Sequence, residues 1–428
     1  MARYRVYTGA LLLVVVLLAP TPLAAQQGAA VDSLRAELRA LQARIDSLVQ
    51  VLRSIQQEEE RKRAQAELER LRAAAAAAAE AGGGAEQTEG EPSFVGRERS
   101  QQSLNPEISV AGDLVGFARA SPRETAVIPR ELEFAFQAAI DPFARTRIFI
   151  THEQELPLDP SATAEGGEGA VEIEEAVVYW VGLPGGTGLD VGKFRMSVGV
   201  LNRWHTHALP EVDRPLALRA ILGNEGLIQT GGSIYWLAPF SGSTAYEFWF
   251  QLTASQNEVL LPEASTPTFL THFNVFRDIG SASYVQLGAT GLYADDENSD
   301  LRARLAGFDF TYNWRPPTRA ARREFTFRTE WLWADQRLDA VTRIARGGYA
   351  AGYYRLGRRW NAGLRFDLLD PFEGAQDVWQ TAATITYSQS EFLRIRGQWN
   401  HLDVAGGTDD QFLLQLVWLI GPHREELY

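Results

Sequence analysis

Cysteine is absent from the sequence and lysine is nearly so, and each scarcity excludes a class of chemistry. With no Cys among its 428 residues, the chain has no disulfide framework, no cysteine-ligated zinc and no thiol nucleophile. Lys62 and Lys193 are the only lysines among 41 basic residues. Because arginine stays protonated in almost any protein environment, Schiff-base and lysine general-base reactions are not expected.

A long apolar run and an excess of positive charge are also missing. The most apolar stretch near the N-terminus, residues 9–19, is shorter than the roughly 18 residues that a membrane-spanning helix needs, and no later stretch is long and apolar enough. The formal net charge of −13 argues against a nucleic-acid partner. Since 45% of the residues are hydrophobic and 22% are charged, wholesale disorder is excluded as well.

Residues 1–25 are predicted to form a secretory signal peptide. Arg3 and Arg5 provide a positive n-region, residues 9–19 an apolar h-region, and Ala24-Ala25 the small residues that precede cleavage. A membrane anchor is the alternative, which the short apolar run disfavours. We therefore expect an exported protein whose mature chain begins after Ala25.

Residues 26–81 are predicted to form an α-helical coiled coil. Between Val31 and Ile55 the apolar residues are spaced 3, 4, 3, 4, 3, 4 and 3 apart, which is an unbroken heptad seam. A seam this narrow is buried only against other helices, so we expect association of chains, and its mixture of Leu and Ile permits a homotrimer. The alternative is a single amphipathic helix lying on the rest of the protein or on a membrane, which usually has a wider apolar face. The predicted trimerisation contacts are Leu34, Leu38, Leu41, Ile45, Leu48, Leu52 and Ile55.

Residues 82–104 are rich in Gly, Glu and Gln and are predicted to be a flexible linker.

From 105 to 428 the hydrophobic period changes to two. Leu364 and Phe366, for example, alternate with Arg365 and Asp367, and such alternation in segments of about ten residues is typical of a transmembrane β-barrel. A soluble β-sandwich alternates too, but its strands are shorter and its outward face is the polar one.

About sixteen segments of this kind follow one another, so the predicted fold class is an all-β transmembrane barrel of about 16 antiparallel strands, an even number as in bacterial single-chain barrels. Short turns alternate with longer polar connectors. This asymmetry predicts a barrel in the bacterial outer membrane, with the short turns and the coiled coil in the periplasm. The expected strands are residues 107–120, 130–141, 144–154, 170–183, 187–199, 227–237, 244–256, 267–278, 282–294, 301–315, 324–336, 344–356, 360–369, 378–388, 391–402 and 409–420.

The longest connector, residues 200–226, is predicted to fold into the barrel. A sixteen-stranded barrel is too wide for wall side chains alone to fill, so a selective channel needs something to narrow it. The alternative is a loop packed on the outer rim. The last strand is apolar on both faces, and we expect its second face to pack against this loop or a neighbouring chain. The predicted constriction consists of Arg203, His205, His207, Glu211, Asp213, Arg214 and Arg219.

The period-two pattern also predicts which charged residues line the lumen. Several carboxylates lie close enough in sequence to pair with an arginine, and the remaining balance is slightly positive. Because charges farther away than about 10 Å are screened at 0.1 M salt, these residues rather than the net charge predict a mild anion preference. On the wall of the later strands they are Arg328, Glu330, Arg365, Asp367, Arg394 and Arg396.

Other chemistry finds little support in the sequence. His205 and His207, with Glu211 and Asp213, could chelate a divalent metal, but on an irregular loop such residues are more often solvated or hydrogen-bonded, and we predict no metal site. No histidine has a Gly-x-Ser-x-Gly partner, and no phosphate-cradling glycine loop occurs. We therefore expect neither an enzyme nor a bound cofactor.

The domain order and one motif together resemble a known family. The strand at residues 189–199 contains Gly192-Lys193-Phe194, and the loop after it contains Asp213-Arg214. With the signal peptide, coiled coil, linker and barrel, these features resemble the phosphate-selective porin O and P family of trimeric outer-membrane channels. The resemblance implies selection of phosphate by a ladder of lysines and arginines in the pore, which in this chain would consist of arginines.

The sequence therefore predicts a homotrimeric porin for passive diffusion of small hydrophilic solutes, in contact with outer-membrane lipid and lipopolysaccharide. Its mechanism would be size exclusion by the inward loop and sorting by the lumen charges. The alternative is a structural outer-membrane anchor that tethers the periplasmic coiled coil. Conductance in a planar bilayer distinguishes the two, because only a channel produces stepwise openings.

Overall fold

The structure is a computed structural model, and it describes the barrel part of the chain. The described residues are 106–120, 123–158, 169–238, 244–254, 257–262, 266–296, 298–338, 341–372, 377–404 and 407–421. The predicted signal peptide (1–25), the coiled coil with its seam from Leu34 to Ile55, and the linker (82–104) lie outside these residues. Those assignments stay predictions.

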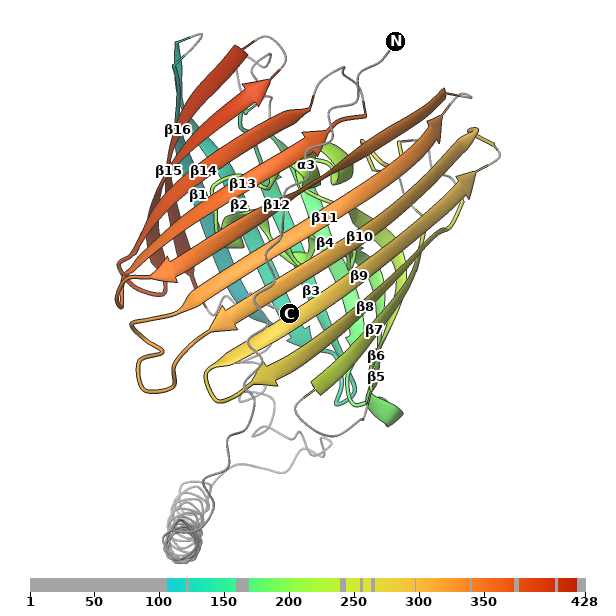
Figure 1. The fold of residues 1–428 in the computed structure, drawn as a ribbon. Coiled ribbons are helices and arrows are strands. Elements are labelled where there is room, and N and C mark those ends of the chain that lie inside the picture. The colour runs from blue at the N-terminus through green and yellow to red at the C-terminus, as the bar shows by residue number, and fades with distance from the viewer. Residues whose placement is uncertain are drawn as a thin grey trace, which may run out of the picture. The chain divides into compact units, whose positions relative to one another are not determined.

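Sixteen antiparallel strands form one closed barrel, which confirms the predicted fold class (Figure 1). Each strand pairs with its neighbours in sequence, and β1 and β16 close the ring through ten paired positions from Val110–Ile420 to Arg119–Gln411. The strands are β1 (Glu107–Arg119), β2 (Glu124–Ala139), β3 (Ala144–Glu153), β4 (Ala170–Trp180), β5 (Thr187–Arg195), β6 (Ile228–Leu237), β7 (Thr244–Thr253), β8 (Thr268–Ile279), β9 (Ser283–Asp296), β10 (Leu301–Trp314), β11 (Phe325–Leu338), β12 (Val341–Arg355), β13 (Trp360–Asp370), β14 (Val378–Ser388), β15 (Leu393–Val404) and β16 (Gly407–Ile420).

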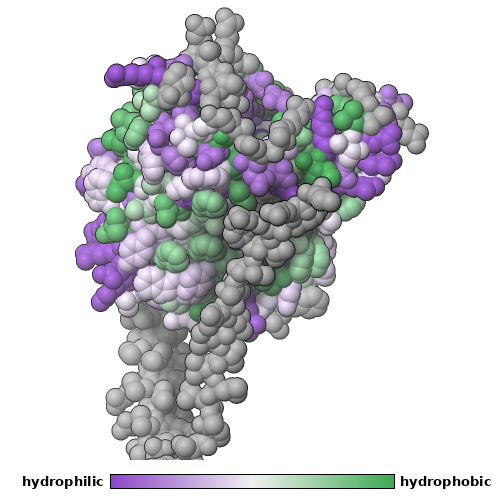
Figure 2. Space-filling model, turned by 45° about the horizontal axis from the view of Figure 1, so that its top comes forward, coloured by the Kyte–Doolittle hydropathy of each residue, from purple (hydrophilic) through white to green (hydrophobic). Residues whose placement is uncertain are grey.

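The period-two pattern explains why these segments form a barrel with an apolar outer surface. On β13, Leu364 and Phe366 are 60% and 48% exposed, whereas Arg365 and Asp367 between them are 1% and 0% exposed. Successive side chains of a strand point to opposite faces, so the apolar set faces outward and the charged set inward. Figure 2 shows apolar side chains over the body of the barrel and hydrophilic ones gathered toward one rim.

The inner wall of the barrel is not uniformly polar. On β10, Leu301, Ala303 and Leu305 face inward and are at most 3% exposed, while Arg302 and Arg304 face outward. Farther along the same strand, the inward-facing side chains are polar and the outward-facing ones are apolar. The inward-facing side chains at the start of β10 are apolar because they pack against the longest loop, which lies inside the barrel.

Strand β2 begins at Glu124, six residues before the predicted start at 130. Pro129 lacks a backbone N–H, yet it lies in the strand opposite Leu114, at a register shift between Asp113 and Leu114. Such bulges accommodate an extra residue, which here is Arg130. The bulge turns the Arg130 side chain to the inside of the barrel.

Connectors at the two ends of the barrel differ in length. After β2 the chain turns within four residues, and the Asp141 carboxylate accepts hydrogen bonds from the backbone N–H groups of Phe143 and Ala144 at 2.7 Å each. At the other end, 32 residues from Met196 to Leu227 join β5 to β6. Within the described part of the chain no helix combines the length and the apolar character needed to cross a membrane.

Candidate functional site: the loop inside the barrel

The connector from Met196 to Leu227, called loop 3 below, is folded into three short helical pieces. These are the 3-10 turns η2 (Leu201–Arg203) and η3 (Thr206–Ala208) and the helix α3 (Leu216–Leu222). Pro215 precedes α3, and Gly223 ends it with φ 95°, a left-handed conformation that glycine adopts without strain. Each piece is short, so the conformation of the loop depends on its contacts with the wall.

The two ends of loop 3 are joined by a single amide side chain. Asn202 donates from Nδ2 to the carbonyl oxygens of Met196 and Leu227 at 2.8 and 3.0 Å, and its Oδ1 accepts the Leu227 N–H at 2.8 Å. Asn202 is 0% exposed. Together with the backbone hydrogen bond from the Met196 N–H to the Leu227 carbonyl at 2.9 Å, it closes the base of the loop.

Glu330 on β11 holds the start of the loop. Its carboxylate accepts the backbone N–H groups of Val200 and Leu201 at 3.0 and 3.1 Å and the Tyr349 hydroxyl at 2.6 Å. Gly199 approaches the same carboxylate so closely that a Cβ would lie 2.0 Å from Oε2. Only glycine fits there, and its φ of 54° is left-handed as well.

One side of loop 3 is apolar and packs against the apolar part of the wall. The buried cluster contains loop residues Met196, Leu201, Leu209, Leu218, Ile221 and Leu222 together with wall residues Leu270, Leu292, Leu305 and Leu332, and Leu260 and Leu261 of the β7–β8 connector. Burial of this kind is worth about 1.5–3 kcal/mol for each large side chain. The apolar wall thus positions loop 3 inside the barrel.

A second apolar contact joins loop 3 to the last strand. Val212 is 0% exposed and lies in a cluster with Leu413 of β16 and Val115 and Phe117 of β1. The inner face of β16 therefore packs against loop 3, one of the two partners that its apolar character predicts.

On the opposite side of loop 3, Asp213 is held by three strands. Arg365 Nη2 lies 3.0 and 3.1 Å from its two carboxylate oxygens. Asp213 also accepts amide hydrogens from Gln380 at 3.0 Å, from Asn400 at 3.3 Å and from Gln398. Burial favours the neutral acid, but Arg365 and these donors outweigh it and lower the pKa of Asp213 below its usual value. The negative charge of Asp213 is therefore neutralised inside the barrel.

Glu211 faces the same arginine at a longer distance. Its Oε2 lies 3.6 Å from Arg365 Nη1, and its Oε1 accepts the hydroxyl of Tyr353. Burial raises the pKa of Glu211, and the attraction of Arg365 does not fully offset the cost of removing the charge from water. The pKa values of two carboxylates two residues apart thus shift in opposite directions, because Arg365 lies closer to Asp213 than to Glu211.

Arginines of β11 and β15 line a cavity of about 320 Å³ next to loop 3. Arg396 Nη1 donates to the Glu211 carbonyl at 2.7 Å, and Arg394 donates to the His207 carbonyl. The Arg328 guanidinium lies 4.7 Å from the centre of the Trp204 ring. Trp204, Leu209 and Pro210 of loop 3 complete the lining.

The remaining loop arginines serve different neighbours. Arg214 braces the loop itself, donating to the carbonyls of Leu201 at 3.0 Å and Trp204 at 3.3 Å. Burial lowers the pKa of Arg214 to about 9, so it stays charged at neutral pH. Arg203 lies 5.8 Å from the ring of Trp249 on β7. Arg214, Arg219 and Asp213 border a smaller cavity of about 50 Å³ between loop 3 and the wall at β2 and β3.

The histidines do not meet Glu211 and Asp213, the carboxylates considered as metal ligands from the sequence. His205 Nδ1 lies 2.8 Å from Glu133 and 3.2 Å from Glu174, and His207 Nδ1 lies 3.0 Å from Glu131. The sequence did not predict that the two histidines meet these glutamates. Glu131 and Glu133 alternate with the outward-facing Leu132 and Phe134, so the sequence alone indicates that they lie on the inner face. Their pairing with loop 3 depends on the fold and could not be predicted.

Comparison with known proteins identifies the fold and no family. No family model matches the sequence. An uncharacterised protein of Aquifex aeolicus (strain VF5) is 26% identical in an alignment of length 315, which covers 62% of this chain and 66% of that protein. The chain thus matches just under two thirds of that relative's length.

Among solved structures, the anion-selective porin from Comamonas acidovorans is similar with a TM-score of 0.51 at 9% identity, covering 74% of this chain and 100% of that one. The outer membrane channel DcaP of Acinetobacter baumannii has a TM-score of 0.49 at 8% identity, with 74% and 98% covered. OprB of Pseudomonas putida has 0.48 at 9% identity, with 76% and 97% covered. The first of these likenesses shows a porin-like sixteen-stranded fold.

Proposed function

We propose that this chain is an outer-membrane porin for passive diffusion of small hydrophilic solutes, with loop 3 as its constriction. The observation that carries the proposal is a closed barrel whose longest loop lies inside it and is held on opposite walls. Glu131 of β2 pairs with a histidine of loop 3, and Leu305 of β10 lies in the apolar cluster that contains loop 3 residues. Strands β2 and β10 are eight strands apart around the ring. A loop fixed across a wide barrel narrows its lumen.

Selectivity follows from the charges that a solute meets at the loop. Arg328, Arg394 and Arg396 line the larger cavity, and Arg355 beside them pairs with Glu324 at 2.8 Å. Asp213 is neutralised by Arg365. A surplus of positive charge therefore remains on this wall and supports a mild anion preference. The porin from Comamonas acidovorans, which has a similar fold, is itself anion-selective.

The finer assignment to a family related to the phosphate-selective porins O and P rests on the strand motif and on Asp213-Arg214. Lys193 Nζ donates to the Ile173 carbonyl at 2.6 Å, so an anion pathway in this chain relies on arginines. The proposal includes a homotrimer joined by the predicted coiled coil in the periplasm, with the apolar outer surface in contact with lipid and lipopolysaccharide.

A structural anchor is the second candidate. It is favoured by the extent to which loop 3 is fixed, with an apolar cluster on one side and the buried Asp213–Arg365 pair on the other. A barrel closed by such a loop would hold the coiled coil in the membrane without conducting.

Planar-bilayer recording of the purified protein separates the two functions. We expect stepwise conductance and, across a salt gradient, a reversal potential of the sign given by anion preference. Phosphate and chloride compared at equal concentration then test the phosphate assignment. A barrel that is folded by heat-modifiable gel mobility but electrically silent would overturn the porin and support the anchor.

A further inference from the structure

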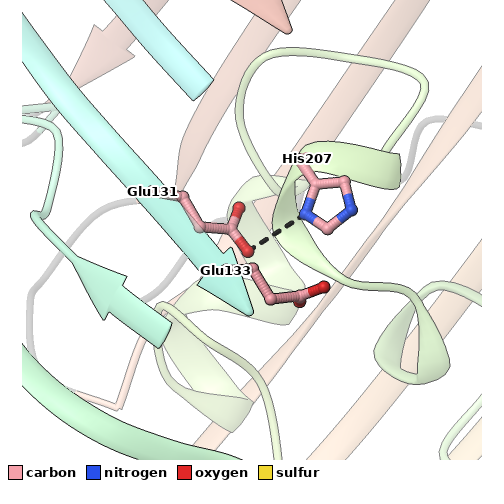
Figure 3. A group of neighbouring side chains, drawn as sticks. All are labelled: Glu131, Glu133 and His207. Carbon is pink, nitrogen blue, oxygen red and sulfur yellow. Dashed lines mark hydrogen bonds and ion pairs between the residues drawn. The ribbon is translucent and has the colours of Figure 1, made fainter. Parts of the chain in front are cut away.

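Three side chains that converge between loop 3 and the wall have the composition of a metal site. Glu131 and Glu133 project inward from β2 toward the segment of η3 that carries His207 (Figure 3). They are 3%, 0% and 0% exposed, in that order. One donor atom from each lies within 4.8 Å of the other two, and His207 Nδ1 is 3.0 Å from Glu131 Oε1.

The second carboxylate oxygen of Glu131 is the unpartnered atom of this group. Glu131 Oε2 is buried and has no hydrogen-bond partner among the described residues. A buried carboxylate oxygen without a partner is costly. The neighbouring Arg130 does not supply one, because its guanidinium is bound to Asp113 and to the carbonyl oxygen of Val212.

The charge balance distinguishes this triad from the adjacent group of Glu133, Glu174 and His205. Glu174 is already paired with Arg195, whereas Glu131 and Glu133 face only the imidazoles of His207 and His205 among the loop contacts described above. A divalent ion with a neutral His207 would balance the two carboxylates. His205 then has a supporting role, because its Nδ1 lies 2.8 Å from Glu133 Oε2 and hydrogen bonds of this kind orient metal-binding carboxylates.

We propose that Glu131, Glu133 and His207 bind one divalent transition-metal ion of the zinc, cobalt or nickel class, with solvent in the remaining position. Imidazole and carboxylate are the donors that these ions accept. Two ligands each about 2.1 Å from a tetrahedral ion stand about 3.4 Å apart, so the 3.0 Å pair needs only a small outward movement. The ion would link η3 of loop 3 to β2.

A small cavity lies near the triad. Arg130 and Thr206, the sequence neighbours of Glu131 and His207, line the cavity of about 50 Å³ between loop 3 and the wall. The site goes beyond diffusion through the channel, since metal binding requires no conductance and can be measured on any folded barrel.

The experiment uses the full mature chain, purified in detergent without a histidine tag and treated with chelator. Cobalt titration should produce the visible bands of a tetrahedral Co²⁺ complex, and elemental analysis after zinc loading and gel filtration should find one zinc per chain. Zinc should abolish the cobalt bands by displacement. Wild-type protein that binds neither metal above the buffer background overturns the proposal, whatever the variants do.

Two ligand variants, Glu131→Gln and His207→Asn, should lose the cobalt bands, and His205→Gln should weaken binding by about 10–100-fold, as changes beside a ligand do. His401→Gln is the matched control, because His401 Nδ1 lies 2.9 Å from Asp410 Oδ1 outside the triad, and it should bind as wild type. Heat-modifiable mobility confirms that each variant is folded. Retained binding in folded Glu131→Gln, or equal loss in His401→Gln, contradicts the site.

Discussion

Arg365 and Asp213 form an ion pair inside the barrel, in which the single nitrogen Nη2 of Arg365 lies 3.0 and 3.1 Å from the two carboxylate oxygens of Asp213. Arg365 comes from β13 and Asp213 from loop 3, and both are at most 3% exposed. Since the loop supplies the acid and the wall supplies the base, the pair fixes the position of the loop.

Asp213→Asn should therefore loosen loop 3. Removing one partner of a buried ion pair costs about 3–5 kcal/mol, and we expect the lower end because Asp367 still contacts Arg365 at 2.8 Å. The measurements are urea unfolding by tryptophan fluorescence and single-channel current, which should become larger and noisier. Arg346→Gln is the control, since the exposed Arg346–Asp370 pair at 2.9 Å should contribute less than about 1 kcal/mol.

Arg394→Glu combined with Arg396→Glu should reverse the sign of selectivity. Both arginines line the larger cavity, so the change replaces two positive charges with two negative ones where solutes pass the loop. The reversal potential across a salt gradient measures the effect. Arg304→Glu, on the outward face near the rim, should leave the potential unchanged. A clear cation preference in the wild type would contradict the anion assignment and leave the porin fold untouched.

The strands were predictable because they depend on local alternation, whereas the loop contacts depend on which strands the closed barrel brings together. Arg365 and Asp367 are recognisable as inward-facing from Leu364 and Phe366 alone. That Arg365 meets Asp213, and His207 meets Glu131, needs the register of the barrel and the path of loop 3. The apolar inner wall was missed because Leu301 and Leu305 alternate with arginines, which reads as the usual outward apolar face.

Anion preference should fall as the pH rises above about 4.5, the ordinary pKa of a glutamic acid. Burial raises the pKa of Glu211 although Arg365 opposes the shift. The proton bound to Glu211 therefore stabilises the folded state below that value, and its contribution is lost as the pH rises through the raised pKa. The released negative charge lies beside the arginine-lined cavity. Reversal potentials at a series of pH values test this, and in Glu211→Gln the dependence should be reduced.

Replacing Leu41, Ile45 and Leu48 with Asp should separate the N-terminal helices of neighbouring chains without unfolding the barrel. The heptad seam is predicted to be buried between the helices of neighbouring chains, whereas the barrel satisfies its own backbone hydrogen bonds. Chemical cross-linking reports association, and Asp at Ala36, Ala43 and Gln50, which lie opposite the seam, is the control. Monomeric helices in the wild type would show that the heptad interpretation is wrong.

Ile221→Ala tests whether the apolar wall alone keeps loop 3 inside the barrel. Ile221 is 0% exposed in the cluster between α3 and the wall, and truncating such a side chain costs about 2–5 kcal/mol. We expect trypsin to cleave folded barrels at Arg203 or Arg219 more rapidly than in the wild type. Leu364→Ala, which removes a side chain from the outer face that is 60% exposed, should not change cleavage. Equal resistance of both variants would mean that the polar contacts of Asp213 and Glu330 suffice to hold the loop, because they are the other attachments left intact by the change.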